Sequence, residues 1–513
     1  MTESESHPRV SVVIPVYNSM PYLTGTIESL LAQNLAAFEI IAVDDGSTDG
    51  SGAELDRFAA LDERVSVVHQ PNSGWPGMPR NRGLERARGK FVLFMDADDA
   101  LVPTALSEMV AQADERGADV VIPRFAGTGG RDVQALFDRH PEGDITLERA
   151  METISPQKLF RRSMLDAAKL RFPEGEVRLE DGIFVAQAYV RARRITFCGK
   201  EPLYLIALRD DGANISRRSI DPENYVSSCR RIAETLRSGV ADERRANALV
   251  LQFFTRKGLR FYAPKRWLPM DAERRRTWVS LHQAFLADLL PAESDRQVVN
   301  PTDRRKLALI RRGDVAALDR LISAAPALAH RSRAVATRQI PGAIELTIEL
   351  EPSAAHSPLR GVGRGFRARL ADRLYRSSRP AMGNRWVRGG SRWLARIVTG
   401  GAVGATLLLA GRRVARPAAI PGRLAASPLS GPNDRGTGAA APARFRFVVP
   451  NSTLRRYGAD RVDLWTVAHS SAALSGGRER VTADPAASKT VGGVRLYMTS
   501  RGNLSLHTPR SRR

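Results

Sequence analysis

The sequence predicts an α/β protein that begins with a doubly wound, mixed sheet and continues into a helical segment and a small all-β domain. Two observations predict the first part. Short apolar, β-branched runs alternate with segments of helical periodicity, and polar clusters directly follow two of these runs. Such alternation is typical of sheets that bind ligands at the carboxyl ends of their strands. The length of 513 residues is enough for two to four domains.

The expected strands of the first part are short runs of apolar or β-branched residues, as in buried parallel strands. They cover residues 9–16, 38–43, 65–68, 90–95 and 119–122. Between them, apolar residues recur three and four positions apart, which is the spacing of a helix. These expected helices cover residues 21–34, 50–61 and 79–88, and a further helix is expected over 183–192, beyond the last of these strands. The clusters Asp44–Asp49 and Asp96–Asp99 lie at the ends of two strands, where a ligand site is expected.

The second part of the chain is predicted to be helical first and then β-structured. Apolar stripes between charged faces predict helices over 225–236, 244–261, 271–290 and 303–322. Alternating apolar residues then predict strands over 344–350, 445–449, 462–467 and 494–498. The stretch 357–443 is rich in Arg, Gly, Pro and Ala and is interpreted as a long, partly disordered insertion. The expected domains are therefore 8–220, 221–328 and a β-sandwich-like domain over 332–508.

Charge is distributed unevenly along the chain. Residues 1–220 carry −7 and the remainder +30, which together give the net charge of +23. The basic second part fits an anionic polymer or membrane surface, whereas no folded nucleic-acid motif appears. Two cysteines, Cys198 and Cys229, are too few for a disulfide framework or a cysteine zinc site. The polar, acidic start of the chain predicts a cytoplasmic protein without a secretory signal.

One uncharged segment, Ile397–Gly411, lies inside the basic stretch. Its 15 residues are fewer than the roughly 20 that a spanning helix needs. A buried or loop segment is the first interpretation. The alternative is a peripheral contact with the inner face of the cell membrane, anchored by Trp386, Trp393 and neighbouring arginines.

Asp96-Ala97-Asp98 places two carboxylates directly after a strand, with one residue between them. Oxygen ligands of this kind suit a hard divalent cation that also binds phosphate oxygens. A nucleoside diphosphate leaving group needs such charge neutralisation. Taken alone, however, an acidic turn after a strand is common and usually only solvated.

Other motifs precede the aspartates in a fixed order. They are Val10–Asn18, Val43–Asp49, Asn72–Gly74 and Pro79–Leu84. Together with Asp96–Asp98 they resemble family 2 of the nucleotide-sugar-dependent glycosyltransferases, which have the GT-A fold, over about residues 8–215. The resemblance implies a UDP-sugar donor and a divalent cation, manganese or magnesium.

The resemblance also implies roles for residues on the first two strands. Pro15 and Tyr17 would line the base and the ribose. Asp44 or Asp45 would accept a hydrogen bond from the uracil imide, for which a carboxylate is suited. The alternative for both aspartates is a turn or helix-capping role, which Gly46-Ser47-Thr48 also favours.

The later motifs would contact the ribose, the diphosphate and the metal. By the same resemblance, Asn72 and Arg80 lie near the nucleotide and the diphosphate, because a guanidinium pairs well with phosphate oxygens. A surface ion pair is the alternative for Arg80. Asp96 would contact ribose or metal, and Asp98 would bind the metal.

Arg178–Gly182 is the second candidate catalytic segment. An inverting transferase needs one base that deprotonates the acceptor hydroxyl as it attacks the anomeric carbon. We assign Asp181 as this base and Glu180 as its acceptor-positioning partner, although the spacing alone does not decide between them. Acidic residues are also ordinary at the start of a helix. The segments Lys158–Arg162 and Arg171–Gly175 match the acceptor-side pattern of the same family.

Tyr204–Ser216 resembles the segment that closes over the donor in this family. Arg209 and Asp211 within it would meet the diphosphate or the acceptor. A glycine-containing turn without a ligand role is the alternative.

The rest of the chain resembles the linker and C-terminal module of wall teichoic acid (polyribitol-phosphate) glycosyltransferases, through Lys306–Asp314 and Val494–Leu506. This second resemblance implies an anionic polyol-phosphate polymer or its lipid-linked precursor as acceptor, and a homotrimer formed through the C-terminal module. The predicted function is therefore an inverting, metal-dependent transfer from a UDP-sugar. The alternatives are a non-catalytic scaffold and a protein that binds anionic polymers or nucleic acid through its basic tail.

Overall fold

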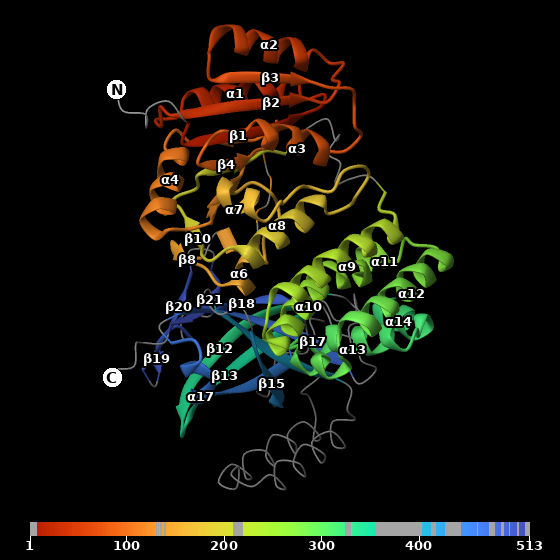
Figure 1. Ribbon diagram of the computed structural model, residues 1–513. Helices are drawn as coiled ribbons and strands as arrows, with labels where there is room; N and C mark the ends of the chain where they lie inside the picture. The colour runs from red at the N-terminus through yellow and green to blue at the C-terminus, as the bar shows by residue number, and fades with distance from the viewer. Residues whose placement is uncertain are drawn as a thin grey trace, which may run out of the picture. The chain divides into compact units, whose positions relative to one another are not determined.

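The chain divides into two structural units. A computed structural model describes residues 8–129, 131, 133, 136–137, 140–208, 219–323, 330–353, 403–411, 417–425, 443–458, 460–470, 478–483, 487–491, 493–499 and 502–507. One unit consists of residues 1–258 with 288–290, and the other of residues 259–287 with 291–513. Figure 1 labels the helices and strands of both units.

A mixed sheet forms the centre of the first unit. Its strand order is β3-β2-β1-β4-β9-β6-β10-β8. The strands are β1 (Val10–Val16), β2 (Phe38–Asp44), β3 (Val65–His69), β4 (Phe91–Phe94), β6 (Val120–Pro123), β8 (Gly143–Asp144), β9 (Leu159–Arg161) and β10 (Ile195–Cys198). β1 is parallel to β2 and to β4, whereas β9 is antiparallel to β4 and β6. The expected doubly wound mixed sheet is confirmed, and the carboxyl ends of β1, β2 and β4 share one edge.

The helices of this unit follow the strands as expected. They are α1 (Tyr22–Leu31), α2 (Ser51–Leu61), α3 (Gly77–Arg86), α4 (Ala105–Arg116), α6 (Leu147–Ala150), α7 (Arg162–Ala167) and α8 (Glu180–Arg191). α3 lies close to β1, because Gly83 has no side chain to collide with Val13. A second, three-stranded sheet has the order β5-β11-β7. Its strands are β5 (Ala100–Leu101), β7 (Phe125–Gly127) and β11 (Tyr204–Ile206).

Two longer helices complete the first unit. α9 (Pro222–Gly239) packs against α8 and against α10 (Glu243–Lys257). Each begins at an aspartate whose carboxylate accepts a backbone N–H three residues on: Asp221 from Asn224 and Asp242 from Arg245, both at 2.8 Å. These caps satisfy donors that a helix start would otherwise leave unpaired.

The second unit begins with further helices. They are η3 (Leu259–Tyr262), α11 (Pro264–Trp267), α12 (Ala272–Leu289), η4 (Ala292–Gln297), α13 (Pro301–Arg311) and α14 (Val315–Ser323). The single helix expected over 303–322 is in fact two. Gly313 has a φ of +67°, a left-handed conformation that ends α13. The carboxylate of Asp314 then accepts the N–H of Ala317 at 2.9 Å and starts α14.

The remainder of the second unit is a β-domain. Its strand order is β14-β15-β16-β13-β12-β18-β17-β21-β20-β19. The strands are β12 (His330–Ile340), β13 (Ala343–Pro352), β14 (Val403–Gly411), β15 (Ala418–Ala425), β16 (Ala443–Pro450), β17 (Arg461–Ser470), β18 (Glu479–Ala483), β19 (Thr490–Val491), β20 (Val494–Met498) and β21 (Leu504–His507), and α17 (Asn451–Arg455) follows β16. β14 also pairs with β17, which closes the sheet into a barrel. The expected sandwich is therefore wrong in this respect: closure gives β14 and β17 partners on both sides.

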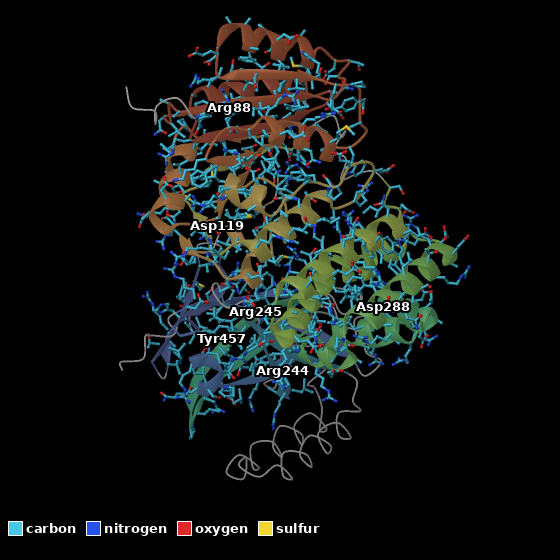
Figure 2. All side chains as sticks on the ribbon, in the orientation of Figure 1. Arg88, Asp119, Arg244, Arg245, Asp288 and Tyr457 are labelled. Carbon is cyan, nitrogen blue, oxygen red and sulfur yellow. The ribbon has the colours of Figure 1, made fainter. Side chains whose placement is uncertain are left out.

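The stretch 357–443, expected to be an insertion, contains two of the barrel strands, β14 and β15. Ala405, Leu407 and Leu409 of β14 alternate into the barrel core. The Tyr457 hydroxyl donates to the carbonyl of Leu409 at 2.7 Å and accepts the N–H of Ala418 at 2.9 Å; Figure 2 labels Tyr457. This part of the stretch thus belongs to the fold, and the remainder lies outside the described residues.

The absence of charge in Ile397–Gly411 has a packing explanation in its described part. Residues 403–411 form a strand in the barrel, which fits the first interpretation, a buried segment. In the portion of the chain that the structure describes, no helix combines the length and the apolar character needed to cross a membrane.

Candidate active site

The loops after β1 and β2 are joined at the edge of the sheet. Asn18 donates its backbone N–H to Ser47 Oγ at 3.0 Å, and its side-chain carbonyl accepts the N–H of Thr48 at 2.8 Å. Pro15 lies half-buried near the end of β1. Tyr17, two residues on, has 46% of its surface exposed. An exposed ring next to an ordered loop fits the expected contact with a base or ribose, which stays a prediction.

Asp44 and Asp45 both have partners within the protein. Asp44 accepts the N–H of Ser47 at 3.0 Å through Oδ1 and contacts His69 Nδ1 at 2.9 Å through Oδ2. The pKa of His69 is raised by the hydrogen bond to Asp44 and next by that to Asp56. The turn-forming role of Asp44 is therefore present, whereas a contact of either aspartate with a base stays a prediction.

Asp45 orders the loop that follows β3. Its Oδ1 accepts Gln70 Nε2 at 2.6 Å and the N–H of Ser73 at 3.0 Å, and its Oδ2 accepts the Ser73 hydroxyl at 2.9 Å. Asn72 lies exposed on this loop, and its side-chain oxygen accepts the N–H of Gly74 at 2.6 Å. These hydrogen bonds tie the loop to the end of β2.

The two oxygens of the Asp96 carboxylate accept hydrogen bonds from different donors. Arg80 Nη2 donates to Oδ1 at 3.0 Å, and Gln157 Nε2 donates to Oδ2 at 2.5 Å. Asp98, two residues on, is half-buried in the same turn. In the described part of the chain, no three His, Cys, Asp or Glu side chains are arranged to hold a metal ion. Mg²⁺ sites commonly use one or two carboxylates together with substrate phosphates, and Asp96 and Asp98 fit that pattern.

Asp99 joins this turn to the strand β11. Its carboxylate accepts the Tyr204 hydroxyl at 2.8 Å and the N–H of Ala207 at 3.0 Å. The same hydroxyl accepts the backbone N–H of Asp96 at 3.3 Å. Burial, followed by the charges of Asp96 and Asp98, raises the pKa of Asp99. Arg209 and Asp211, which the sequence placed at the diphosphate or acceptor, lie outside the described residues just beyond this anchored strand.

Arg80 joins the aspartate turn to the start of α8. It is buried on α3, and its Nη1 donates to Glu180 Oε1 at 3.0 Å while Nη2 pairs with Asp96. The surface ion pair considered for Arg80 is therefore wrong, because this guanidinium pairs with two carboxylates below the surface. Its contact with a diphosphate stays a prediction.

Glu180 is held at both of its oxygens. In addition to Arg80, the indole N–H of Trp75 donates to Oε2 at 3.1 Å. Burial, and next the charge of Asp181, raises the pKa of Glu180 to about 7, against the opposing effects of Arg80 and Trp75. A carboxyl group with a pKa near neutrality is common at catalytic sites.

Asp181 is half-buried in the first turn of α8. Its Oδ1 accepts the N–H of Gly182 at 2.6 Å. Burial raises the pKa of Asp181, although Lys257 and Arg80 oppose the increase. The hydrogen bonds distinguish the two acids: side-chain donors hold both oxygens of Glu180, whereas the printed donor to Asp181 is a backbone N–H, and the pKa of Asp181 is raised by burial. A carboxylate of this kind suits a general base.

An aromatic cluster fixes the helix that carries both acids. Phe184 of α8 stacks on Phe172 with ring centroids 4.0 Å apart and meets Phe94 edge-on at 5.4 Å. Phe94 is the last residue of β4, two positions before Asp96. Asn81 of α3 further binds the backbone of Phe172 through both side-chain atoms, at 2.8 and 3.0 Å. The aspartate turn and the start of α8 are thus built on one core.

The turn before β9 contributes two further polar residues. Gln157 contacts Asp96, as described above. Lys158 is fully buried, and its Nζ donates to the carbonyl oxygen of Ser155 and, at 3.4 Å, to Thr153 Oγ1. Burial lowers the pKa of Lys158 to about 7, and the charge of Asp181 opposes this. Lys158 thus places an amine that titrates near neutral pH close to the proposed base.

Three residues of the site were not assigned roles from the sequence: Trp75, Gln157 and Lys158. Trp75 and Gln157 stand next to motifs that were recognised, after Asn72–Gly74 and before Lys158–Arg162. Adjacency to a motif was the only available signal. Trp75 lies 105 positions from its partner Glu180, and Gln157 lies 61 positions from its partner Asp96.

Comparison with known proteins identifies the family of this chain. The family model described as Glycosyl transferase family 2 matches residues 11–172. Glycosyltransferase GlyG of Streptococcus pneumoniae is 30% identical over 251 residues, which are 45% of this chain and 80% of that protein. The chain belongs to family 2 of the glycosyltransferases. The family resemblance inferred from the ordered motifs is confirmed.

Other matches extend beyond the catalytic part of this family 2 member. The model described as Glycosyl transferase TarS linker domain matches residues 222–322. Poly(ribitol-phosphate) beta-glucosyltransferase of Bacillus spizizenii is 31% identical over 316 residues, which are 60% of this chain and 49% of that protein. The chain therefore spans about half the length of that relative. These matches confirm the second resemblance, to poly(ribitol-phosphate) glycosyltransferases.

Solved structures agree with the fold. Residues 1–349 of Staphylococcus aureus TarS, in complex with UDP-GlcNAc, align with a TM-score of 0.57 at 28% identity, covering 62% of this chain and 91% of that one. A second crystal structure of S. aureus TarS aligns with a TM-score of 0.59 at 20% identity, and the alignment covers 97% of this chain and 85% of that one. The second likeness extends the agreement in fold to the β-domain.

Proposed function

We propose that this chain transfers a sugar from a UDP-sugar to a hydroxyl group of an anionic polyol-phosphate polymer or its lipid-linked precursor, with inversion at the anomeric carbon. The observation that carries the proposal is the pairing of Arg80 with both Asp96 and Glu180. This pairing joins the expected donor-side aspartate to the expected acceptor-side acid within one buried network. A transferase needs its donor and acceptor in such a fixed relation.

Asp181 acts as the general base in this proposal. Its carboxylate takes the proton of the acceptor hydroxyl while the hydroxyl oxygen bonds to the anomeric carbon. The bond from that carbon to the diphosphate oxygen breaks, and its electron pair leaves with UDP. Because burial raises the pKa of Asp181, the carboxylate is a stronger base than an exposed aspartate. A single displacement with one base leads to inversion.

Asp96 and Asp98 would hold a manganese or magnesium ion together with the diphosphate. When bound, the ion would neutralise charge that develops on the leaving group. Arg80 and Gln157 orient the Asp96 carboxylate. Pro15, Tyr17, Asp44, Asp45, Asn72, Arg209 and Asp211 are the remaining residues proposed for the donor.

The acceptor proposal rests on charge and on the relatives. The Bacillus spizizenii relative is named as acting on poly(ribitol phosphate). On this chain, Lys257 lies near enough to Asp181 to lower its pKa, so a cationic group borders the proposed base. A polymer of negative phosphodiesters would be attracted to such a border. Assembly into a homotrimer, a cytoplasmic location and a membrane contact are further proposals that rest on the resemblance and on composition.

Calorimetric titration with UDP, with and without Mn²⁺, tests the donor site. The parent protein should bind UDP in a metal-dependent way, and Asp98→Asn should lose most of that dependence. Asp181→Asn is the matched control, because it should retain metal-dependent UDP binding and yet lose sugar transfer. Equal loss of UDP binding in both variants would contradict the division of roles. Titration with UDP-glucose, UDP-N-acetylglucosamine and UDP-galactose then identifies the donor sugar.

A further inference from the structure

Trp75 connects the loop after β3 to the start of α8. The tryptophan is 4% exposed, and its indole N–H donates to Glu180 Oε2 at 3.1 Å, across 105 positions of the chain. Its backbone carbonyl accepts the Ser73 hydroxyl at 3.1 Å, and Ser73 is in turn bound by Asp45. The indole therefore links a loop at the expected nucleotide side to an acid at the expected acceptor side.

Glu180 cannot rotate freely in this arrangement. Arg80 holds Oε1 at 3.0 Å while Trp75 holds Oε2, so each carboxylate oxygen has its own donor. The guanidinium of Arg178 lies 5.3 Å from the centre of the Trp75 ring, a cation–π contact that helps to hold the indole in place. The contacts place the Glu180 carboxylate next to Asp181 in one orientation.

We propose that Trp75 is a positioning residue of the transfer reaction, whose indole N–H keeps Glu180 oriented and ionised beside Asp181. The proposal rests on the proposed function. An ionised Glu180 satisfies one of the two carboxylate contacts of Arg80. If Glu180 gained a proton, Arg80 would be left with excess positive charge near Asp181 and would weaken that base.

The charged groups around Glu180 set the direction of the pH effect. They are Arg80 from α3, Asp181 from α8, Asp96 through Arg80, and Arg178 over the indole ring. A hydrogen bond donated to a carboxylate favours its charged form, so loss of the indole N–H should raise the pKa of Glu180 above about 7. The acidic limb of the rate profile should then move to higher pH.

The first test compares the pH profiles of UDP release for the parent and for Trp75→Phe. We expect the acidic limb of kcat to shift upward by about one pH unit, while KM for the donor stays within about twofold, because a lost hydrogen bond to a charged group is worth about that much. Trp267→Phe is the matched control. It removes an indole N–H bond of 2.6 Å to Asp319 in the other unit and should leave the limb in place.

A second variant removes the N–H without leaving a cavity. Replacement of Trp75 by β-(3-benzothienyl)alanine puts sulfur in place of the ring nitrogen in a side chain of almost the same shape. The acidic limb of the kcat profile of this variant should shift as it does in Trp75→Phe. Coincident profiles for the parent and a folded benzothienyl variant would overturn the proposal.

Stability gives a readout that does not depend on activity. The free energy of unfolding lost in the benzothienyl variant should grow between pH 6 and pH 8, because the indole N–H stabilises ionised Glu180 more than protonated Glu180. A loss that is independent of pH would also overturn the proposal. If the parent releases no UDP from any UDP-sugar, the proposed function fails, and the pH dependence of this loss still decides the role of Trp75.

Discussion

Arg80 and Glu180, one hundred positions apart, form a buried ion pair of 3.0 Å. Since Arg80 also pairs with Asp96 at 3.0 Å, one guanidinium compensates two carboxylates from different loops. Buried charges need such compensation, because removal of one partner leaves the other uncompensated away from water.

Replacement of Arg80 should therefore destabilise the first unit. We expect Arg80→Met to lower the free energy of unfolding by about 3–5 kcal/mol, the usual cost of breaking a buried pair. Denaturant unfolding measures this. Arg82→Met on the same helix is the matched control: its contact with Glu85, 3.8 Å long, is at the surface and should be worth less than about 1 kcal/mol. Similar losses in both variants would contradict the role of Arg80.

Tyr204 should stabilise the aspartate turn through Asp99. Tyr204→Phe removes a 2.8 Å hydrogen bond to the buried Asp99 carboxyl group and the acceptor of the Asp96 N–H, and should cost about 1–3 kcal/mol because both groups lose a partner. Tyr189→Phe removes a 2.9 Å bond to the neutral carbonyl of Thr153 and should cost about 0.5–1.5 kcal/mol. Thermal or denaturant unfolding of the pair decides the order. Metal-dependent UDP binding should weaken only in Tyr204→Phe.

Lys158 should make stability depend on pH. Burial lowers its pKa to about 7, so between pH 7 and pH 10 the unfolded chain holds a proton that the folded chain has released. The free energy of unfolding of the parent should therefore rise with pH in this window. Lys158→Met should lack that rise, whereas Lys169→Met, at an exposed position, should run parallel to the parent. Parallel curves for Lys158→Met and the parent would refute the assignment.

Strand β14 should contribute to the stability of the second unit. Leu407 is fully buried in the barrel core, so Leu407→Ala should cost about 2–5 kcal/mol. Met498 in the same barrel is 42% exposed, and Met498→Ala should change stability by no more than about 0.5 kcal/mol. Unfolding of the second unit followed by circular dichroism measures both. A negligible cost for Leu407→Ala would favour the insertion that the sequence suggested.

The sequence by itself determined the elements of the first unit and the neighbourhood of the candidate site. Apolar runs and helical spacing are local properties, so β1, β2 and β4 were predictable from a few residues each. Parallel strands bring their carboxyl ends to one edge, and this places Asp44, Asp45 and Asp96 together without further information.

The tertiary structure alone decided which side chains pair across that edge. Nothing near Arg80 in the sequence indicates that it binds Asp96 and Glu180, and nothing near Trp75 indicates Glu180. These contacts depend on how α3 and α8 pack around Phe94, Phe172 and Phe184, and packing is set by residues far apart in the chain. The barrel was misread for the same reason: β14 is a strand because β15 and β17 lie on either side of it. Periodicity identifies an element, but only its partners establish which groups it brings together.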